Sequence, residues 1–162
     1  MLINSLQTSK EMMKKPDAET VEVIAASSNL TKEQLIDAVA KINETDSSRL
    51  VQLVQVFDAD SIAGPMHVKF AFFHALKAFE NKRNIMRNRA LEILLRAACS
   101  RQIRKATEIV GVKEPTNIVI GFIGNKKQIL RLLRATEKRS ILTQKKDEEQ
   151  KLIQKMVLLQ LD

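Results

Sequence analysis

The sequence predicts a mixed α+β fold with about four strands and a C-terminal helix, and three observations support this prediction. Apolar runs at 50–57 and 117–123 have the composition of strands buried in a protein interior. Other segments carry apolar residues at spacings of three and four, which is typical of helices with one buried side. The chain has 162 residues, of which 44% are apolar and 28% charged, as in ordinary globular proteins. We therefore expect a single domain, residues 1–162, built around one core.

The amino-terminal part of the chain predicts two strands with a helix between them. Residues 1–6 are expected to form an edge strand. A short helix at Ser9–Lys15 should stop before Pro16, because the residue that precedes a proline is pushed out of the helical region. The next strand shows an alternation of period two, in which Val21, Val23 and Ala25 are interleaved with Glu22 and Ile24.

A capping box predicts where the following helix begins. Thr31 and Gln34 have the spacing at which each side chain can bond the backbone N–H of the other residue. The residues that this helix should bury recur at spacings of four and three: Leu35, Val39 and Ile42. Leu50–Phe57 is apolar at nearly every position, which predicts a central strand covered on both faces.

A turn rich in small residues, Asp58–Pro65, leads into the most apolar helix, Met66–Asn81, with Pro65 suited to its first turn. Apolar residues wrap most of the circumference, so we expect this to be the buried central helix. They are Val68, Phe70, Phe72, Phe73, Leu76 and Phe79. His67 and His74 share a face but stand about 10 Å apart along the axis, so a metal site is not expected.

Two further helices are expected at Arg83–Ser100 and Arg101–Val110. The first should bury Ile85, Leu91, Leu94, Leu95 and Ala98. Ser100 is the expected N-cap of the second helix, which Gly111 should end in a left-handed conformation. So short a connection also fits a helix-turn-helix motif.

Asn117–Ile123 predicts another strand, followed by a helix that contains Ile129, Leu130, Leu132 and Leu133. The intervening Gly124-Asn125-Lys126-Lys127 has the residue types of a phosphate-binding turn at a helix N-terminus. It lacks the four-residue gap and the Gly-Lys-Ser/Thr ending of a nucleotide-binding loop, so an ordinary turn is the better interpretation.

Positive charge is concentrated between Lys77 and Lys105, where nine basic residues stand against Glu80 and Glu92. Such a field attracts polyanions, and a well-solvated pair of helices is the alternative interpretation. The candidate nucleic-acid contacts are Lys77, Lys82, Arg83, Arg87, Arg89, Arg96, Arg101 and Arg104. Trp and Tyr are absent, so nucleic acid would be held mainly through its phosphates. Glu92 has arginines at helical spacing, which favours ion pairs along the helix over an acid–base role.

The tail predicts an amphipathic helix at about 145–161. Leu152, Met156 and Leu159 share one face of this helix, with Ile153 and Val157 beside it. Either this apolar face packs on its own domain, or it is exposed and awaits a partner. Under the second interpretation the partner-binding residues are Leu152, Ile153, Met156, Val157 and Leu159.

No catalytic constellation stands out in the sequence. It has no nucleophile elbow, no His/Cys cluster with metal-ligand spacing and no glycine-rich dinucleotide loop. We therefore expect no enzymatic activity, no metal and no cofactor. Cys99, the single cysteine, is expected to be a small buried residue and suits a reducing cytosol. Neither a transmembrane helix nor a signal peptide is predicted, so we expect a cytoplasmic location.

The middle of the chain carries a specific set of motifs: Asp58, Ile62-Ala63-Gly64, His67, the Ala75/Ala78 spacing, Asn84-Ile85, Glu92-Ile93-Leu94-Leu95, Arg101-Gln102-Ile103, Ala106 and Gly111. Together they resemble the PRPK-binding (TPRKB-like) subunit family of the KEOPS complex, and an archaeal member is expected. The family often has a glycine shortly before Arg-Gln-Ile, where this chain has Ala98-Cys99-Ser100. The turn at that point is therefore a departure from the family pattern.

The resemblance implies a small, mainly antiparallel sheet surrounded by helices, and no catalytic activity. Family members bind the small atypical kinase/ATPase subunit of KEOPS, partly through their C-terminal helix, and raise its activity. KEOPS installs threonylcarbamoyl on the adenosine beside the anticodon of certain tRNAs, and archaeal members of this family also engage the tRNA acceptor end. On this resemblance the basic residues would hold tRNA, and the tail would dock on the kinase subunit.

Two other hypotheses remain open from the sequence. A DNA-binding regulator would use Arg101–Val110 as the recognition helix of a helix-turn-helix and would prefer duplex DNA to tRNA. An unrecognised enzyme would use His67, His74 or Glu92, and the isolated protein would then show turnover.

Overall fold

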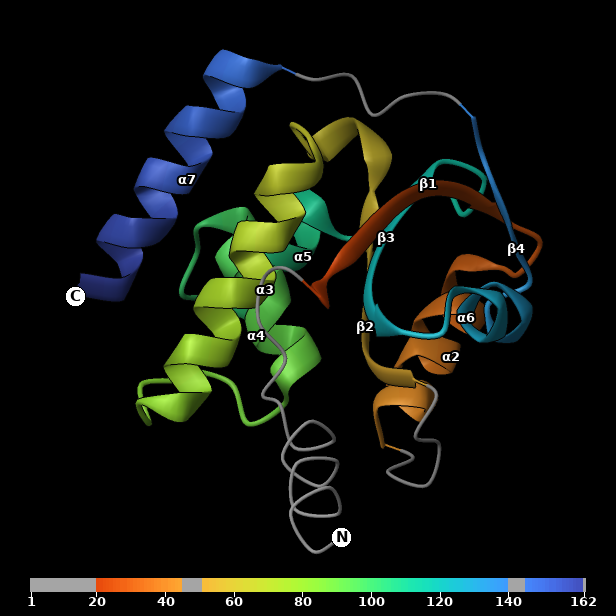
Figure 1. Ribbon diagram of the computed structural model, residues 1–162, viewed down its shortest axis with the longest axis horizontal. Coiled ribbons are helices and arrows are strands. Elements are labelled where there is room, and N and C mark those ends of the chain that lie inside the picture. The colour runs from red at the N-terminus through yellow and green to blue at the C-terminus, as the bar shows by residue number, and fades with distance from the viewer. Residues whose placement is uncertain (1–19, 45–50, 140–144, 162) are drawn as a thin grey trace, which may run out of the picture.

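The computed structural model describes residues 20–44, 51–139 and 145–161, which form one antiparallel sheet with helices on both sides (Figure 1). The strands are β1 (Glu22–Ser28), β2 (Val51–Asp58), β3 (Ile118–Gly124) and β4 (Ala135–Glu137). Their order in the sheet is β2-β3-β1-β4, and each neighbouring pair runs antiparallel. The predicted mixed α+β fold, with a small antiparallel sheet and a C-terminal helix, is confirmed.

The helices divide between the two faces of the sheet. They are α2 (Lys32–Glu44), α3 (Pro65–Glu80), α4 (Arg89–Ala98), α5 (Ile103–Val110), α6 (Lys126–Leu132) and α7 (Lys146–Leu161), with a short 3₁₀ turn, η2, at Ala59–Ser61. Helices α2 and α6 lie on one side, whereas α3 and α4 lie on the other, with α7 packed against them (Figure 1). No helix in the described ranges is both long and apolar enough to cross a membrane.

Strand β3 shows how one strand serves two cores. Ile118, Ile120 and Phe122 belong to the core with α2 and α6, whereas Val119 and Ile123 belong to the core with α3 and α4, because successive side chains of a strand point to opposite faces. Gly121 faces α3, where a Cβ atom would come within 2.6 Å of Val68 Cγ1 and 2.7 Å of Phe72 Cε2. The missing side chain therefore lets α3 pack directly on the sheet.

A strand was predicted at Leu50–Phe57 in the centre of the sheet. The strand is present as β2, but the prediction of a central position is wrong. It is buried, but it lies at the edge of the described sheet. Its outward backbone groups are bonded by side chains: Asn43 accepts from Val54 N at 3.0 Å and donates to Val54 O at 2.9 Å. The Gln55 amide oxygen accepts from Val56 N at 2.9 Å. Side chains thus bond backbone groups that no strand of the described sheet reaches.

Two predicted helix starts are confirmed in atomic detail. In the capping box of α2, the Gln34 amide oxygen accepts from Thr31 N at 3.0 Å, and Thr31 Oγ1 accepts from Gln34 N at 3.2 Å. The predicted buried residues of α2, at positions 35, 39 and 42, are all buried. Helix α3 begins at Pro65 as expected, because a proline in the first turn gives up no helical hydrogen bond.

The helix predicted at Arg83–Ser100 starts six residues later, at Arg89. Asn88 is its N-cap, with an Oδ1 that accepts from Ala90 N at 2.8 Å and Leu91 N at 3.2 Å. The preceding residues connect α3 to α4 without helical structure. The predicted burial of two apolar residues is wrong: Ile85, which precedes the helix, is 38% exposed, and Leu91, within it, is 37% exposed.

The structure differs from the prediction at two residues of the connection from α4 to α5 and at the end of α5. Cys99 ends α4 in the left-handed conformation, with φ 51° and ψ 43°, at the point where the family pattern often has glycine. Gln102, not Ser100, is the N-cap of α5, and the Ser100 hydroxyl oxygen instead accepts from Gln102 N at 3.2 Å. Gly111 is not left-handed, because its φ is −65°. A Cβ atom there would lie 2.3 Å from the carbonyl oxygen of Thr107, so close approach explains this glycine.

The strand predicted at Asn117–Ile123 is confirmed as β3, and the turn after it is an ordinary helix start. Asn125 Oδ1 accepts from Gln128 N at 3.0 Å and so caps α6. Strand β4 was not predicted, since its three residues carry too little pattern to be recognised. The strand expected at 1–6 and the helix expected at Ser9–Lys15 lie outside the described residues.

Candidate RNA and partner interfaces

The connection between α3 and α4, together with the first residue of α4, presents a group of cations to solvent. We call Lys82, Arg83, Arg87 and Arg89 the basic loop residues; all four side chains are exposed. None of them forms an ion pair with a carboxylate in the part of the chain that the structure describes. This end of the α3–α4 pair is at the lower left of Figure 1. Four exposed cations within residues 82–89 concentrate positive potential, which attracts anions.

Both ends of this connection are anchored to helices. Helix α3 ends at Glu80, and beyond its C-cap Lys82 adopts a left-handed conformation, φ 56°, while Arg83 N donates to Ala78 O at 2.8 Å. This pattern is a Schellman motif, in which a backbone N–H beyond the helix bonds a carbonyl five residues earlier. The Asn88 cap of α4 closes the other end.

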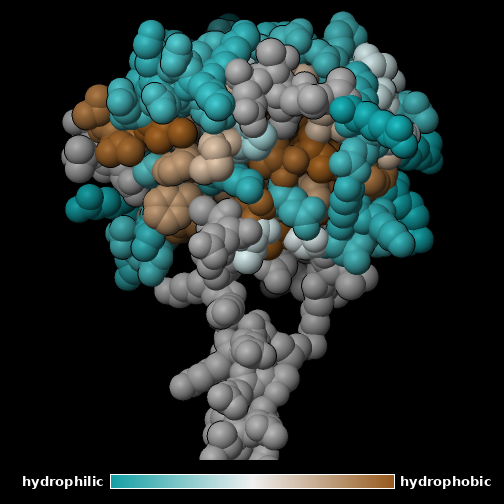
Figure 2. All heavy atoms as spheres, turned by 45° about the horizontal axis from the view of Figure 1, so that its top comes forward, coloured by the Kyte–Doolittle hydropathy of each residue, from teal (hydrophilic) through white to brown (hydrophobic). Residues whose placement is uncertain are grey.

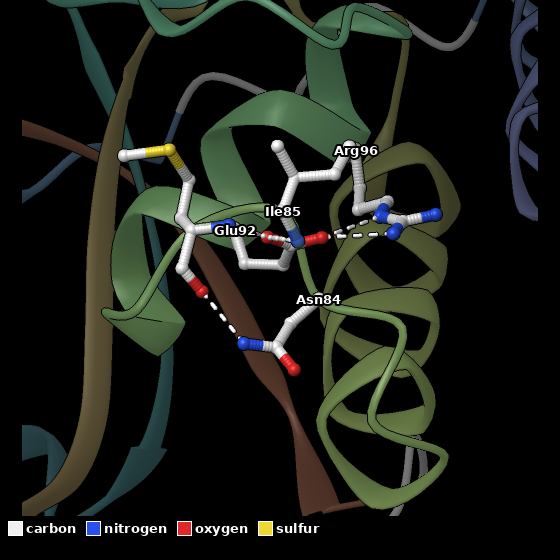
Figure 3. Close-up of polar contacts among 5 residues, drawn as sticks. Asn84, Ile85, Glu92 and Arg96 are labelled. Atoms are coloured by element: carbon white, nitrogen blue, oxygen red, sulfur yellow. Dashed lines mark hydrogen bonds and ion pairs between the residues drawn. The ribbon is translucent and has the colours of Figure 1, made fainter.

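A buried carboxylate anchors the middle of the connection (Figure 3). Glu92 is 0% exposed, and its Oε2 accepts from Ile85 N at 3.0 Å and from Met86 N at 2.7 Å. The Asn84 side chain donates to Met86 O at 2.9 Å. The backbone between the basic loop residues is therefore bonded to α4 through Glu92. The sequence had predicted that this carboxylate forms ion pairs along the surface of the helix.

Arg96 is the partner of this carboxylate and is itself only 2% exposed. Its Nε and Nη2 donate to Glu92 Oε1 at 3.1 and 2.8 Å, while Nη1 has no hydrogen-bond partner among the described residues. Arg96 was predicted to contact RNA, and its burial removes it from the exposed surface in this structure. The expected ion pairs along the surface of the helix are likewise replaced by one pair inside the protein.

The other predicted RNA contacts divide into separate places. Lys77, near the end of α3, is 3.8 Å from Glu80 in an exposed ion pair. Arg101 and Arg104 are exposed at the opposite end of α4 from the basic loop residues, and Arg104 lies 3.6 Å from Glu108. Ten helical residues separate the two ends by about 15 Å. The sequence correctly located the excess charge, but it did not show that the charge forms two patches.

Helix α7 covers part of the core and also leaves apolar side chains in solvent. Met156 is fully buried, and Ile153 packs against the same core cluster. Val157 and Leu158 are 42% and 61% exposed. On the face of the molecule that Figure 2 draws, apolar side chains gather at the left. Figure 1 places the C-terminal half of α7 on the same side. Helix α7 thus packs on its own domain with one side and leaves apolar residues exposed on another, and whether a partner covers them stays a prediction.

The predicted partner-binding residues differ accordingly. Leu152 is half-buried and its carbonyl oxygen is 3.5 Å from the donor Cys99 Sγ. Met156 faces its own core, whereas Val157 faces solvent. The side chain of Leu159 lies outside the described residues.

An apolar groove was missed by sequence reasoning. It has a volume of about 340 Å³ and runs between α2 and α4 over the outer edge of β2. Ile36, Val39, Leu91 and Leu94 line it, with Ile36 and Leu91 exposed. A second cavity of about 240 Å³ shares Asn43, Asn88 and Ala90 with the groove and is also lined by two basic loop residues, at positions 87 and 89. No local pattern could reveal either cavity, because each forms between elements distant in the sequence.

The residues considered for catalysis are buried and bonded in the core. His67 Nδ1 accepts from Ala63 N at 3.1 Å, and Nε2 lies 2.8 Å from Ala97 O, to which it donates in the corresponding tautomer. Burial lowers the pKa of His67, although the bond to Ala97 O and the carboxylate of Glu149 partly oppose this. His74 is 4% exposed. These side chains, like Glu92, are not open to a substrate in this structure.

Cys99 is half-buried, and burial raises the pKa of its thiol while the ammonium group of Lys155 acts in the opposite direction. A raised pKa leaves little reactive thiolate at neutral pH. Within the described ranges, no three residues of the types His, Cys, Asp and Glu are grouped so that they could hold a metal ion.

No curated protein matches the chain. The family model for the kinase binding protein CGI-121 matches residues 4–158, nearly the whole sequence, including the basic loop residues and most of α7. The chain therefore belongs to the CGI-121 family of kinase-binding proteins.

Proposed function

We propose that this chain is a cytoplasmic, non-enzymatic adaptor subunit of the KEOPS tRNA threonylcarbamoyladenosine-modification complex. In this role it binds the small atypical kinase/ATPase subunit, stimulates it, and recruits tRNA by the acceptor end. Membership of a kinase-binding family supports the protein partner. The observation that supports the tRNA partner is the group of four exposed cations at 82–89, none of which pairs with a carboxylate among the described residues.

The two binding surfaces use different elements. The basic loop residues lie on the connection of α3 to α4 and at the first residue of α4, whereas the exposed apolar residues Val157 and Leu158 lie on α7. One molecule can therefore hold a polyanion and an apolar protein surface at the same time. An adaptor needs this separation, because it must keep its RNA while it contacts the kinase subunit.

The tRNA-binding part is tested by reversing charge in the basic loop. Arg83→Glu with Arg87→Glu should weaken binding of a fluorescein-labelled tRNA transcript and reduce the slope of log Kd against log salt by about two, one per lost phosphate contact. Lys127→Glu with Arg131→Glu is the matched control, since these exposed cations belong to α6 on the other side of the sheet. Equal effects of the two double variants would remove the basic loop from the interface.

Competition distinguishes this proposal from the DNA-binding regulator. Unlabelled tRNA should displace the labelled transcript, whereas a DNA duplex of the same nucleotide content should compete poorly. Stronger competition by duplex DNA would favour the helix-turn-helix interpretation of α4 and α5.

The kinase-binding part is tested on the exposed side of α7. Leu158→Glu should prevent co-purification with the small kinase subunit of KEOPS, because it puts an unpaired charge into an apolar contact. Residue 158 is 61% exposed in the free chain, so folding should be unaffected. Leu132→Glu on α6 is the control, since this leucine is also exposed, at 42%. Retained association of the Leu158 variant would exclude this surface of α7.

A further inference from the structure

We propose that Glu92 and Arg96 are positioning residues for RNA binding: their buried pair fixes the backbone that carries the basic loop residues. Both side chains are buried, Glu92 at 0% and Arg96 at 2% exposed, so neither acts by contacting RNA itself. This inference rests on the proposed tRNA-binding function. It adds the residues that set the geometry of that site.

The segment 84–87 has no repetitive secondary structure to hold it. Its fixed conformation depends on three hydrogen bonds: from Ile85 N and Met86 N to Glu92 Oε2, and from the Asn84 side chain to Met86 O. Arg83 and Arg87 flank this bonded segment on its two sides. The distance between these two cations is therefore set by the carboxylate that binds the backbone between them.

Arg96 makes the buried carboxylate possible. Glu92 accepts four hydrogen bonds in all, two from backbone N–H groups and two from the guanidinium group. A carboxylate buried without a counterion would be strongly unfavourable. The two carboxylate oxygens of Glu92 bind different partners: Oε1 accepts from Arg96, and Oε2 accepts from the loop backbone (Figure 3).

The pair is poorly explained by stability alone. Two apolar side chains of similar volume often stabilise a core as well as a buried ion pair does, and Arg96 Nη1 has no hydrogen-bond partner among the described residues. An apolar replacement, however, could not accept the N–H groups of residues 85 and 86. The charged pair is therefore suited to shaping the loop.

A fixed loop binds RNA more tightly than a free loop with the same charge. A flexible segment loses conformational entropy when it is ordered on a ligand, whereas a segment already held in place does not. Release of the loop should therefore weaken RNA binding by about tenfold. All exposed cations remain, so the number of phosphates that the bound protein neutralises should stay the same.

The test replaces the pair without leaving an unpaired charge. In the double variant Glu92→Leu with Arg96→Met, hydrogen exchange of the amides of Ile85 and Met86 should accelerate at least tenfold, and the unfolding midpoint should stay close to that of the parent protein. Binding of the labelled tRNA transcript should weaken by about tenfold. The slope of log Kd against log salt should be unchanged, which separates lost positioning from lost charge.

Two results would overturn the inference while the tRNA-binding function stands. One is that the amides of residues 85 and 86 remain protected in the double variant. The other is that they exchange freely although tRNA affinity equals that of the parent, while Arg83→Glu with Arg87→Glu still weakens binding. If the parent protein itself does not bind tRNA, the proposed function fails, and this inference fails with it.

A second variant covers the case in which the double variant does not fold. Asn84→Ala removes only the bond to Met86 O and leaves the buried pair intact. It should accelerate amide exchange in the loop and weaken tRNA binding several-fold, again with an unchanged salt slope. Faster exchange without weaker binding would count against positioning here as well.

Discussion

Glu149 Oε2 lies 3.3 Å from the backbone nitrogen of His67, 82 positions earlier in the chain. His67 is the third residue of α3, so its N–H group has no acceptor within the helix. The residue at the N-cap position is Gly64, which has no side chain to bond this group. A carboxylate from α7 therefore caps α3 and lies at the positive end of its dipole. The contact fixes the beginning of α7 against the domain.

We expect that loss of this cap weakens the docking of α7. Glu149→Ala should lower the free energy of unfolding by about 1 kcal/mol, the usual contribution of a capping side chain. Gly64→Ala should cost a similar amount, because the new Cβ atom would lie 2.0 Å from the present position of Glu149 Oε2 and displace it. Since both changes remove one contact, the double variant should lose little more than either single variant. Fully additive losses in urea denaturation would contradict this cap.

The buried His67 should make stability depend on pH. Burial lowers its pKa below the ordinary value of 6.5, so the unfolded chain binds a proton more readily than the folded chain. The free energy of unfolding is therefore not reduced by His67 protonation above about pH 6.5. Below that pH it decreases as the pH falls, by at most about 1.4 kcal/mol per pH unit.

Substitution of His67 measures this effect. His67→Asn keeps an acceptor near Ala63 N but has no proton to gain. Between pH 7 and 5, the free energy of unfolding should fall less in this variant than in the parent, whatever its stability at pH 7. Parallel curves for the two proteins would assign the pH dependence to other groups.

We expect Cys99 to make the protein less stable than a glycine at the same position would. A residue with a Cβ atom costs about 1–2 kcal/mol in the left-handed conformation, which Cys99 adopts. Comparison of Cys99→Gly with Cys99→Ala isolates this backbone term, since both variants lack the thiol that contacts Leu152 O. The glycine variant should be the more stable by about 1 kcal/mol in thermal or urea unfolding. Equal stabilities would show that the backbone of this turn rearranges.

Asn43 should contribute more to stability than an exposed amide does. Asn43→Ala leaves the N–H and C=O groups of Val54 without their partner at the edge of β2, which should cost about 2 kcal/mol in unfolding free energy. Asn117→Ala is the matched control, because its amide bonds Asp60 at an exposed site. Similar losses in the two variants would show that water replaces Asn43 at the strand edge.

Local features of the fold could be read from the sequence because neighbouring residues alone decide them. The capping box at Thr31, the start of α3 at Pro65 and the spacing of buried residues in α2 depend on bonds within a few residues. The alternation and apolar runs likewise predicted three of the four strands. The excess of cations before α4 is a property of composition and needs no structure.

The position of each element and the environment of each charge depended on contacts between distant segments. The sequence spacing of Glu92 and Arg96 fits an exposed ion pair, but packing of α4 against α3 and the loop buries both residues. The same holds for α7, whose apolar spacing shows a face but not whether Met156 or Val157 meets the core. Sequence thus determined which residues are charged or apolar and which segments form helices. Tertiary packing decided which of them face solvent, because burial depends on what other parts of the chain cover.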